Sequence, residues 1–302
     1  MLHISEKLPL LKSPQPKTKK VVSPNMKKSD PIQSITPTEA FKPRFKSETP
    51  EFCAVEIDPK DWIIRQTTAV CGIRLEDYII PENMVKYINE NGNSWSRDDI
   101  RKYYKTFIGG HNFFDHDQEI KNSYGFLADA VMRKIDVGNN GDYIIYVDVI
   151  TCTNKNQSPN MDNLRRIESN EINTLSMGCQ SDAVRCSQCG TVSSTSENDC
   201  KHLRRQIGRK FITPKGKISK TSAIVWANDE DGNSEMGLDF IELSWVGNPA
   251  YRGATASFDL NGFEDKDKIY FKIPTTSVYR KDGFDAIPYW ESKGELKIIK
   301  GV

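Results

Sequence analysis

Residues 124–152 read YGFLADAVMRKIDVGNNGDYIIYVDVITC, and this stretch decides the fold class. Both of its ends are rich in β-branched and aromatic residues, as strands are. Between them stands VGNNGD, whose glycines and asparagines are typical of a tight turn. The stretch therefore predicts an antiparallel pair of strands and, with it, a domain built mainly from β-structure.

The rest of the chain extends this pattern on both sides. Further strand-like runs are CAVEI (53–57), WIIRQTTAVCGI (62–73), INTLSMGCQSDAV (172–184) and LDFIELSWVGNPA (238–250). Short helices are expected at 83–91, at 159–170 and after Ser96, which with Asp99 resembles a capping box. The prediction is an α+β fold with a mostly antiparallel, β-barrel-like core flanked by a few helices.

Composition divides the chain into three parts. Residues 1–50 hold 8 of the 15 prolines, and ten Lys or Arg against four Asp or Glu. Such a segment buries too little apolar surface to offset the entropy of ordering it. We expect a disordered basic arm there, either a solvated linker or a docking or removable segment. Residues 51–261 form the expected folded domain, and residues 262–302 a charged, weakly patterned C-terminal segment.

The overall composition restricts the class of protein. The formal net charge is +1, so global charge points to neither a nucleic-acid nor a membrane partner. No apolar run approaches the roughly 18 residues of a membrane span, and the N-terminus does not resemble a signal peptide, so a cytosolic setting is expected. Seven cysteines, an odd number, favour reduced thiols over a disulfide framework.

One cysteine-rich insertion has the spacing of a metal site. CSQCG is followed by CKH, which gives the pattern C-x2-C-x10-C-x-H. Three thiolates and one imidazole suit zinc in a closed tetrahedral site with no open position for a catalytic water. The predicted ligands of this structural zinc are Cys186, Cys189, Cys200 and His202. The insertion, 185–210, is then a zinc knuckle; the alternative is a set of unbound surface thiols.

The same insertion raises a second class of function, a zinc-ribbon nucleic-acid binder. The run KHLRRQIGRK at 201–210 is basic, as such a binder requires. It lacks interleaved aromatic residues on which bases could stack. A solvated basic face is therefore the preferred interpretation, and nucleic acid is not the expected partner.

A histidine base, if one operates, is His111 or His116. Of the other two histidines, His3 lies in the N-terminal arm and His202 belongs to the metal motif. His116 stands in the sequence Asp-His-Asp, in a polar loop before a strand. Neighbouring carboxylates hold the pKa of such an imidazole near or above neutrality. On the sequence alone, a loop histidine is more often an ordinary surface residue.

Ser176 lies in the sequence TLSMG. A small nucleophile followed by a glycine leaves space for a substrate backbone and for amide donors to an oxyanion. The backbone amides of Met177 and Gly178 are the candidate donors. Most Ser-x-Gly sequences are simply turns or strand ends.

Glu242 lies in the sequence FIELSWV. Strand alternation places Phe240, Glu242 and Ser244 on one face, with Ile241, Leu243 and Trp245 on the other. A carboxylate beside a buried face needs a partner, and an imidazole would serve. The alternative is an exposed strand glutamate.

Taken in order, these motifs resemble those of the tailed-phage prohead proteases, a family related in fold to the herpesvirus assemblins. DHDQEIKNSYGFLADA is similar to the family's histidine loop and the Gly-led strand after it. NMDNLRRIESNEI resembles its helix, and NTLSMGC resembles its serine strand. IELSWVGNPAYRGA resembles its acidic strand with a Pro-Ala tail. CSQCG and CKH stand where many large-phage members carry a similar insert. The resemblance covers roughly residues 60–256; Trp245 departs from the usual aliphatic residue, which should affect packing more than chemistry.

The resemblance implies a protease core carrying the zinc-knuckle insertion. It implies Ser176 as nucleophile, His116 as general base and Glu242 as the group that orients the imidazole; His116 fits the family's spacing to Gly125 better than His111 does. The implied function is prohead maturation, a serine endopeptidase acting on capsid proteins, scaffold proteins and itself.

The implied location is inside the assembling prohead in the host cytoplasm, where the protease could self-associate, with no membrane partner. Two other interpretations stay open. One is a catalytically inactive capsid or scaffold component on the same fold, against which the intact Ser-His-Glu set argues. The other is the zinc-ribbon nucleic-acid-binding protein.

Overall fold

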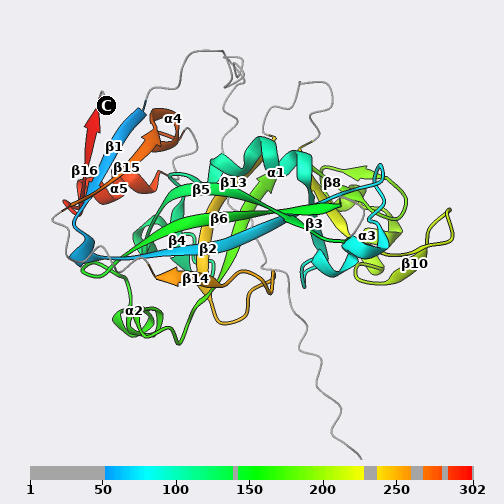
Figure 1. The fold of residues 1–302 in the computed structure, drawn as a ribbon, viewed down its shortest axis with the longest axis horizontal. Helices are drawn as coiled ribbons and strands as arrows, with labels where there is room; N and C mark the ends of the chain where they lie inside the picture. The colour runs from blue at the N-terminus through cyan, green and yellow to red at the C-terminus, as the bar shows by residue number, and fades with distance from the viewer. Residues whose placement is uncertain (1–51, 139–141, 228–236, 260–267, 281–284, 301–302) are drawn as a thin grey trace, which may run out of the picture. The chain divides into compact units, whose positions relative to one another are not determined.

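The computed structural model describes residues 52–138, 142–227, 237–259, 268–280 and 285–300 (Figure 1). Within these ranges the chain is an α+β protein, mostly β-strand with a few short helices. The expected basic arm at 1–50 lies outside the described residues. No helix in these ranges combines the length and the apolar character that crossing a membrane requires.

Short strands and shorter helices follow one another along the chain. The strands are β1 (Phe52–Ile57), β2 (Trp62–Ile73), β3 (Asn93–Ser96), β4 (His111–Phe114), β5 (Gly125–Asp136), β6 (Tyr143–Asn154), β7 (Thr174–Ser181), β8 (Ala183–Cys186), β9 (Val192–Ser193), β10 (Lys210–Ile212), β11 (Ile218–Lys220), β12 (Ala223–Trp226), β13 (Leu238–Val246), β14 (Ala256–Asp259), β15 (Ile269–Pro274) and β16 (Leu296–Lys300). The α-helices are α1 (Arg97–Tyr103), α2 (Met161–Glu168), α3 (Lys201–Arg205), α4 (Thr275–Val278) and α5 (Ala286–Ser292). The 3₁₀ helices are η1 (Pro59–Asp61), η2 (Glu82–Tyr87), η3 (Tyr104–Phe107), η4 (Ile120–Asn122) and η5 (Ser196–Asn198).

Most of the strands belong to one large sheet. Its order is β7-β13-β4-β5-β6-β2-β3-β12-β8-β9, with β14 paired to β2. Neighbours run antiparallel except at β13–β4, β2–β3 and β3–β12. The sheet curls into a half-barrel, which agrees in coarse form with the barrel-like core that the sequence predicts. Its β7 end and its β8–β9 end carry the two groups of residues that the sequence singles out.

The strand pair expected at 124–152 is confirmed as β5 and β6. They run antiparallel from Gly125 opposite Thr153 to Asp136 opposite Tyr143, and β2 pairs with the other edge of β6. Gly125 has no room for a side chain, because a Cβ there would lie 1.8 Å from the carbonyl oxygen of Cys152. The close approach of two backbones therefore requires the glycine that opens β5.

Local signals predicted two of the helices correctly. Ser96 caps α1, where its Oγ accepts a hydrogen bond from the Asp99 N–H at 2.9 Å. Helix α2 lies inside the expected range, and Leu164 and Ile167 are its buried residues. These helices begin where a side chain can satisfy free backbone N–H groups, as capping predicts.

The helix expected at 83–91 is wrong in type and in length. The structure has the 3₁₀ helix η2 instead, which ends at Tyr87. Asn89 forms a turn there, because its Oδ1 accepts from the Asn93 N–H at 2.7 Å and its carbonyl accepts from the Gly92 N–H at 3.0 Å. Asparagine side chains that bond to nearby backbone compete with helix formation.

The C-terminal part contains more structure than its composition indicates. We expected a charged, weakly patterned segment from residue 262. In the structure β15 and β16 pair antiparallel with the two edges of β1, forming a second, three-stranded sheet. The buried Trp290 of α5 packs edge-on against Trp62 of β2, with ring centroids 5.5 Å apart. Burial of such a side chain contributes roughly 1.5–3 kcal/mol, so this part stabilises the main core.

Candidate active site and metal centre

Glu242 lies in the middle of β13, with β7 on one side and β4 on the other. Its side chain is 1% exposed. A carboxylate buried to this degree needs partners, because an isolated buried charge is very unfavourable. Both of its oxygens have one: Ser244 Oγ donates to Oε2, and His116 Nδ1 lies 2.8 Å from Oε1.

A bulge in β13 changes which residues share a face with Glu242. Glu242 pairs with Gly178, and Phe240 pairs with the adjacent residue Cys179, so the register shifts between them. A bulge of this kind reverses the alternation of side chains. Phe240 therefore points into the core, where its ring stacks on Phe107 at 4.3 Å. The expectation that Phe240 shares the face of Glu242 is wrong, whereas for Ser244 it is confirmed.

The loop after β4 brings His116 over β13. Asp115 and His116 both have positive φ angles, 52° and 59°, a region that Asp and His adopt more readily than most residues. The Asp115 N–H donates to the Trp245 carbonyl at 2.9 Å, and the Asp117 N–H donates to the Phe114 carbonyl at 3.1 Å. The first of these bonds fixes the loop to β13 itself, so a backbone contact one residue before His116 determines where the imidazole lies.

The His116 imidazole is both partnered and accessible. Its side chain is 41% exposed. The hydrogen bond to Glu242 raises the pKa of His116 above its ordinary value, against a smaller opposing effect of desolvation. With Nδ1 directed at the carboxylate, a neutral ring carries its proton there and keeps the lone pair of Nε2. Such an imidazole can accept a proton from a hydroxyl that reaches Nε2.

His111 has a different environment. It is fully buried in β4, opposite Glu242 in the β13–β4 pair, and its Nδ1 lies 2.9 Å from Ser123 Oγ. Its ring stacks on Phe113, with centroids 5.0 Å apart. The hydrogen bond to Glu242 belongs to His116, so the geometry favours His116 where the sequence left both histidines open.

Ser176 lies on β7, next to β13. It stands opposite Ser244 and two residues before Gly178, which stands opposite Glu242. Paired residues project to the same face and diagonal neighbours are roughly 7–8 Å apart, so Ser176 shares the face of the Glu242 carboxylate. Ser176 is 9% exposed. Among the described residues its hydroxyl has no hydrogen bond to His116: the structure joins His116 to Glu242 and sets Ser176 beside them.

The two amides proposed as oxyanion donors point in different directions. The Leu175 N–H donates to the Ala254 carbonyl, on the side of β7 away from β13. Backbone groups alternate along a strand. The Met177 N–H is therefore directed to the same outer side, and the Gly178 N–H toward β13. Of the two, the Met177 amide is the one that the sheet leaves for another acceptor.

Gly178 makes room for the Glu242 carboxylate. A Cβ at this position would lie 2.4 Å from Glu242 Oε1, the oxygen that His116 contacts. The sequence interpretation assigned the space beside this glycine to a substrate backbone. In the structure the nearest occupant is the buried carboxylate, so the Ser-x-Gly motif and the acidic strand fit each other directly.

We expect Gly178→Ala to separate His116 from Glu242 and to lower the free energy of unfolding by about 1–3 kcal/mol, the usual effect of overpacking. Urea denaturation would measure the stability, and NMR of the His116 ring would measure the contact. Gly247→Ala is the matched control, because no atom lies within 4 Å of a Cβ built there. Unchanged His116 signals in Gly178→Ala would contradict the prediction.

We expect Glu242→Gln to lower the pKa of His116 toward the ordinary value of about 6.5, because an amide cannot supply the charge that favours imidazolium. An NMR titration of the His116 ring measures this. Glu171→Gln is the control, since it removes an exposed carboxylate that pairs with Arg166. A pKa that is equal in wild type and Glu242→Gln would show that the contact is absent in solution.

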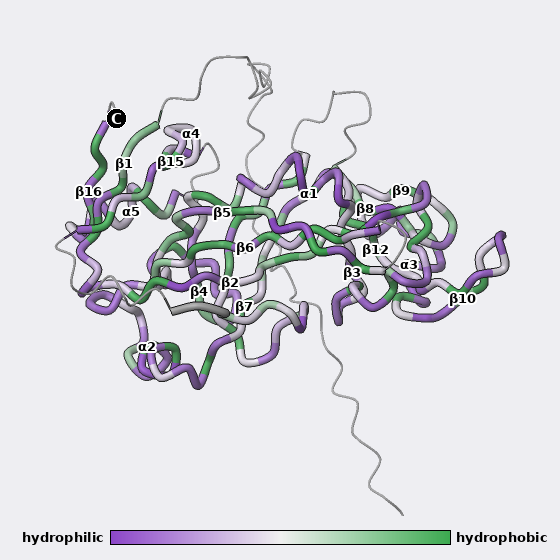
Figure 2. The backbone as a smooth tube through the Cα atoms, in the orientation of Figure 1, coloured by the Kyte–Doolittle hydropathy of each residue, from purple (hydrophilic) through white to green (hydrophobic). Residues whose placement is uncertain are grey.

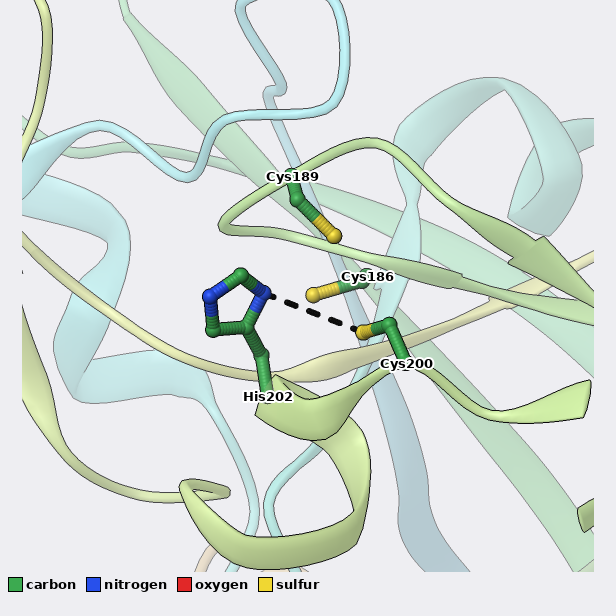
Figure 3. Close-up of side chains that lie close together, drawn as sticks. All are labelled: Cys186, Cys189, Cys200 and His202. Atoms are coloured by element: carbon green, nitrogen blue, oxygen red, sulfur yellow. Dashed lines mark hydrogen bonds between the residues drawn. The ribbon is translucent and has the colours of Figure 1, made fainter.

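The second group of residues lies at the β8–β9 end of the sheet. Strand β8 ends at Cys186, and a turn follows it. Gly190 in this turn has a φ of 74°, and its N–H donates to the Cys186 carbonyl at 2.9 Å. Helix α3 follows directly after Cys200 and carries His202. The ligand atoms of Cys186, Cys189, Cys200 and His202 all lie within 4.8 Å of one another. Figure 3 shows the four side chains converging from the turn and the helix.

This cluster has the chemistry of a metal site. Three sulfur atoms and one imidazole nitrogen suit zinc, and four protein ligands complete a tetrahedron. Its base is packed, because Cys186 is buried with Leu203 and Ala223. Of the other cysteines, Cys53, Cys71 and Cys152 are buried in strands, as small core residues are.

Sequence reasoning missed one member of the first site. Ser244 was placed on the face of Glu242 but was given no role, although its hydroxyl donates to the second carboxylate oxygen. A Ser two residues after a buried acid on one strand is the signal that could have found it.

Comparison with family models, with curated proteins and with solved structures finds no match to this chain.

Proposed function

We propose that this chain is a serine endopeptidase of the Ser-His-Glu type, with Ser176 as nucleophile, His116 as general base and Glu242 as the group that orients the imidazole. The observation that carries the proposal is the hydrogen bond of 2.8 Å between His116 and the buried Glu242, on the face of the sheet that Ser176 shares. The bond from a buried acid that fixes the tautomer of an accessible histidine is one of the two hydrogen bonds of a catalytic triad, and Ser176 stands on the neighbouring strand as the candidate for the other.

The spacing of the three residues supports this assignment. Sheet geometry puts Ser176 and Glu242 roughly 7–8 Å apart as diagonal neighbours. A relay from carboxylate through imidazole to hydroxyl needs two hydrogen bonds of about 2.8 Å and the width of the ring. Catalytic hydrogen bonds are often long before substrate binds, so closure of Nε2 onto Ser176 Oγ is expected in the substrate complex.

The proposed chemistry is acyl transfer. His116 Nε2 takes the proton of Ser176 as Oγ attacks a peptide carbonyl, and returns it to the leaving amine as the C–N bond breaks. Water then attacks the acyl-enzyme, with His116 again taking a proton and returning it to Oγ. Glu242 stabilises the imidazolium that forms in each step, and the outward Met177 amide is the candidate donor to the oxyanion.

The raised pKa of His116 has two consequences of opposite sign. The bound proton stabilises the fold; this contribution is complete below about pH 6.5, the pKa of an unfolded histidine, and is lost as pH rises through the folded pKa. A general base must be neutral, so activity should instead rise as pH passes through the same pKa. In Glu242→Gln the acid limb of the pH–activity profile should move to lower pH, and kcat should fall by roughly 10⁴-fold.

The metal cluster has a structural part in this proposal. Zinc would be held by Cys186, Cys189, Cys200 and His202, and it would cross-link the insertion. Because all four ligands come from the protein, no coordination position would stay open for a catalytic water. The insertion follows the strand that carries Ser176, so its folding limits the freedom of the chain beyond β7.

The proposed biological role is maturation of a phage prohead, by cleavage of capsid proteins, scaffold proteins and the chain itself. Its support is the order of the sequence motifs together with the site geometry. It includes a location inside the assembling prohead in the host cytoplasm.

A fluorophosphonate probe tests the enzyme class directly. We expect one covalent adduct per chain, assigned to Ser176 by peptide mass mapping, and its loss in His116→Ala, because labelling needs an activated hydroxyl. Arg165→Ala, a change at an exposed helix position, should label like wild type. A folded protein that does not react with the probe, or that reacts at another serine, would favour an inactive component on this fold.

A further inference from the structure

The chain concentrates positive charge beyond the metal cluster. Residues 201–220, KHLRRQIGRKFITPKGKISK, contain eight Lys or Arg and no Asp or Glu, in a chain whose net charge is +1. In the described parts of the chain only one of these eight forms an ion pair with a carboxylate, Lys215 with Glu76 at 3.2 Å. The other seven have no carboxylate partner among the described residues, and one of them, Arg204, donates to the Glu197 carbonyl.

The β10–β11 hairpin in this segment has two different faces. Its cross-strand pairs are Lys210–Lys220, Phe211–Ser219 and Ile212–Ile218. Alternation puts Phe211 and Ser219 on one face, and Ser219 is buried and donates to the Ile80 carbonyl at 2.7 Å. That face is turned to the protein. The other face, with its two lysines and two isoleucines, is here called the outer face.

The outer face is unfavourable for a protein alone in water. Ile212 is 76% exposed and Ile218 is 46% exposed, although they form an adjacent apolar pair. Lys210 and Lys220 stand directly opposite each other, and like charges in that position destabilise a strand pair. A bound partner that covered the isoleucines and neutralised the lysines would remove both costs.

Other exposed residues of the insertion are similar in character. Arg204 and Arg205 of α3 are exposed, and Val192 and Ile207 are 40% exposed each. Figure 2 shows apolar and polar stretches following each other closely along the β10 part of the chain. Surfaces that bind proteins commonly combine exposed apolar residues with arginines.

We propose that the outer face of the β10–β11 hairpin is a docking surface for an acidic protein segment that carries aliphatic side chains. Carboxylates of the segment pair with the lysines, and its aliphatic side chains cover Ile212 and Ile218. The surface lies on the metal-cluster insertion and uses none of the proposed catalytic residues, so it stands whether or not the chain is a protease.

A nucleic acid fits the same surface less well. Phosphates would neutralise the charge, but they would leave the two isoleucines without apolar contact. The one aromatic residue between 201 and 220 is Phe211, which lies on the inner face of the hairpin with Ser219 and so is not presented for stacking on a base. The apolar half of the surface is what distinguishes a protein partner.

The experiment compares three fluorescein-labelled probes by anisotropy with the full chain: the peptide EEDLIEDEE, its charge-matched counterpart EEDSSEDEE, and a single-stranded DNA of roughly 20 nucleotides. We expect the aliphatic peptide to bind about tenfold or more tightly than its counterpart, because it buries apolar surface as well as charge. Ile212→Ser with Ile218→Ser should abolish that difference. Lys210→Glu with Lys220→Glu should weaken both peptides, most clearly at about 50 mM salt.

A double charge reversal elsewhere is the matched control. Lys134→Glu with Arg165→Glu changes net charge equally at exposed positions on β5 and α2, and should leave peptide binding unchanged. Equal affinity for the two peptides, no binding of either at low salt, or tighter binding of DNA that survives the isoleucine substitutions would each overturn the proposal.

Discussion

Ser176→Ala should abolish self-processing and ester hydrolysis, with kcat lower by about 10⁴- to 10⁶-fold, while the fold and the metal content stay unchanged. The substitution removes the only atom proposed to form a bond to the substrate. The side chain is small and lies on the face of β7 away from the main core residues, so its loss leaves almost no cavity. Intact-mass analysis over time would follow self-processing, and p-nitrophenyl acetate would follow hydrolysis.

Ser181→Ala is the matched control for this prediction. Ser181 lies on the same strand, and its Oγ donates to the Ala183 carbonyl at 3.1 Å, at a position opposite Leu238 rather than near Glu242. It should retain wild-type rates. A Ser176→Ala protein that still cleaves itself would remove Ser176 from the proposed mechanism, and a Ser181→Ala protein that does not cleave itself would show that the loss is not specific to position 176.

The fold was predictable where the signal is local. The sequence VGNNGD separates two strand-like runs, and Ser96 Oγ accepts from the amide three residues on, so β5, β6 and α1 follow from near neighbours. The strands of the C-terminal part were missed because each is short and interrupted by lysines. They are ordered by pairing with β1, which lies more than 200 residues away in the chain. Such pairing has no local signature in the sequence.

The candidate site was predictable in its members and not in its geometry. Alternation placed Ser244 beside Glu242, but the bulge that turns Phe240 into the core depends on the partner strand. The positive φ angles of Asp115 and His116, which bring the imidazole to the carboxylate, likewise depend on a backbone bond to β13. Sequence motifs named the residues, and contacts between distant strands decide how they meet.

Cys189→Ser should reduce bound zinc from about one ion per chain to almost none and unfold the insertion at 185–210. Cys189 is exposed, so the substitution opens no cavity and its effect comes from the lost ligand. The loop between the two halves of the motif, TVSSTSEND, has no large apolar side chain beyond Val192, which is itself 40% exposed. Without the ion, α3 is held against β8 by the small apolar cluster of Leu203, Cys186 and Ala223.

The binding free energy of structural zinc sites is on the order of 10 kcal/mol, and in a small metal-dependent unit it is folding free energy. Amide hydrogen exchange should therefore accelerate across β8, β9 and α3 and remain slow in β5 and β6, and zinc content measured by mass spectrometry should fall in parallel. Cys53→Ala, which removes a buried thiol outside the cluster, should keep its zinc even though it loses some stability. Full zinc content in Cys189→Ser, or equal amide exchange rates in Cys189→Ser and Cys53→Ala, would mean that metal binding by the cluster does not stabilise this insertion.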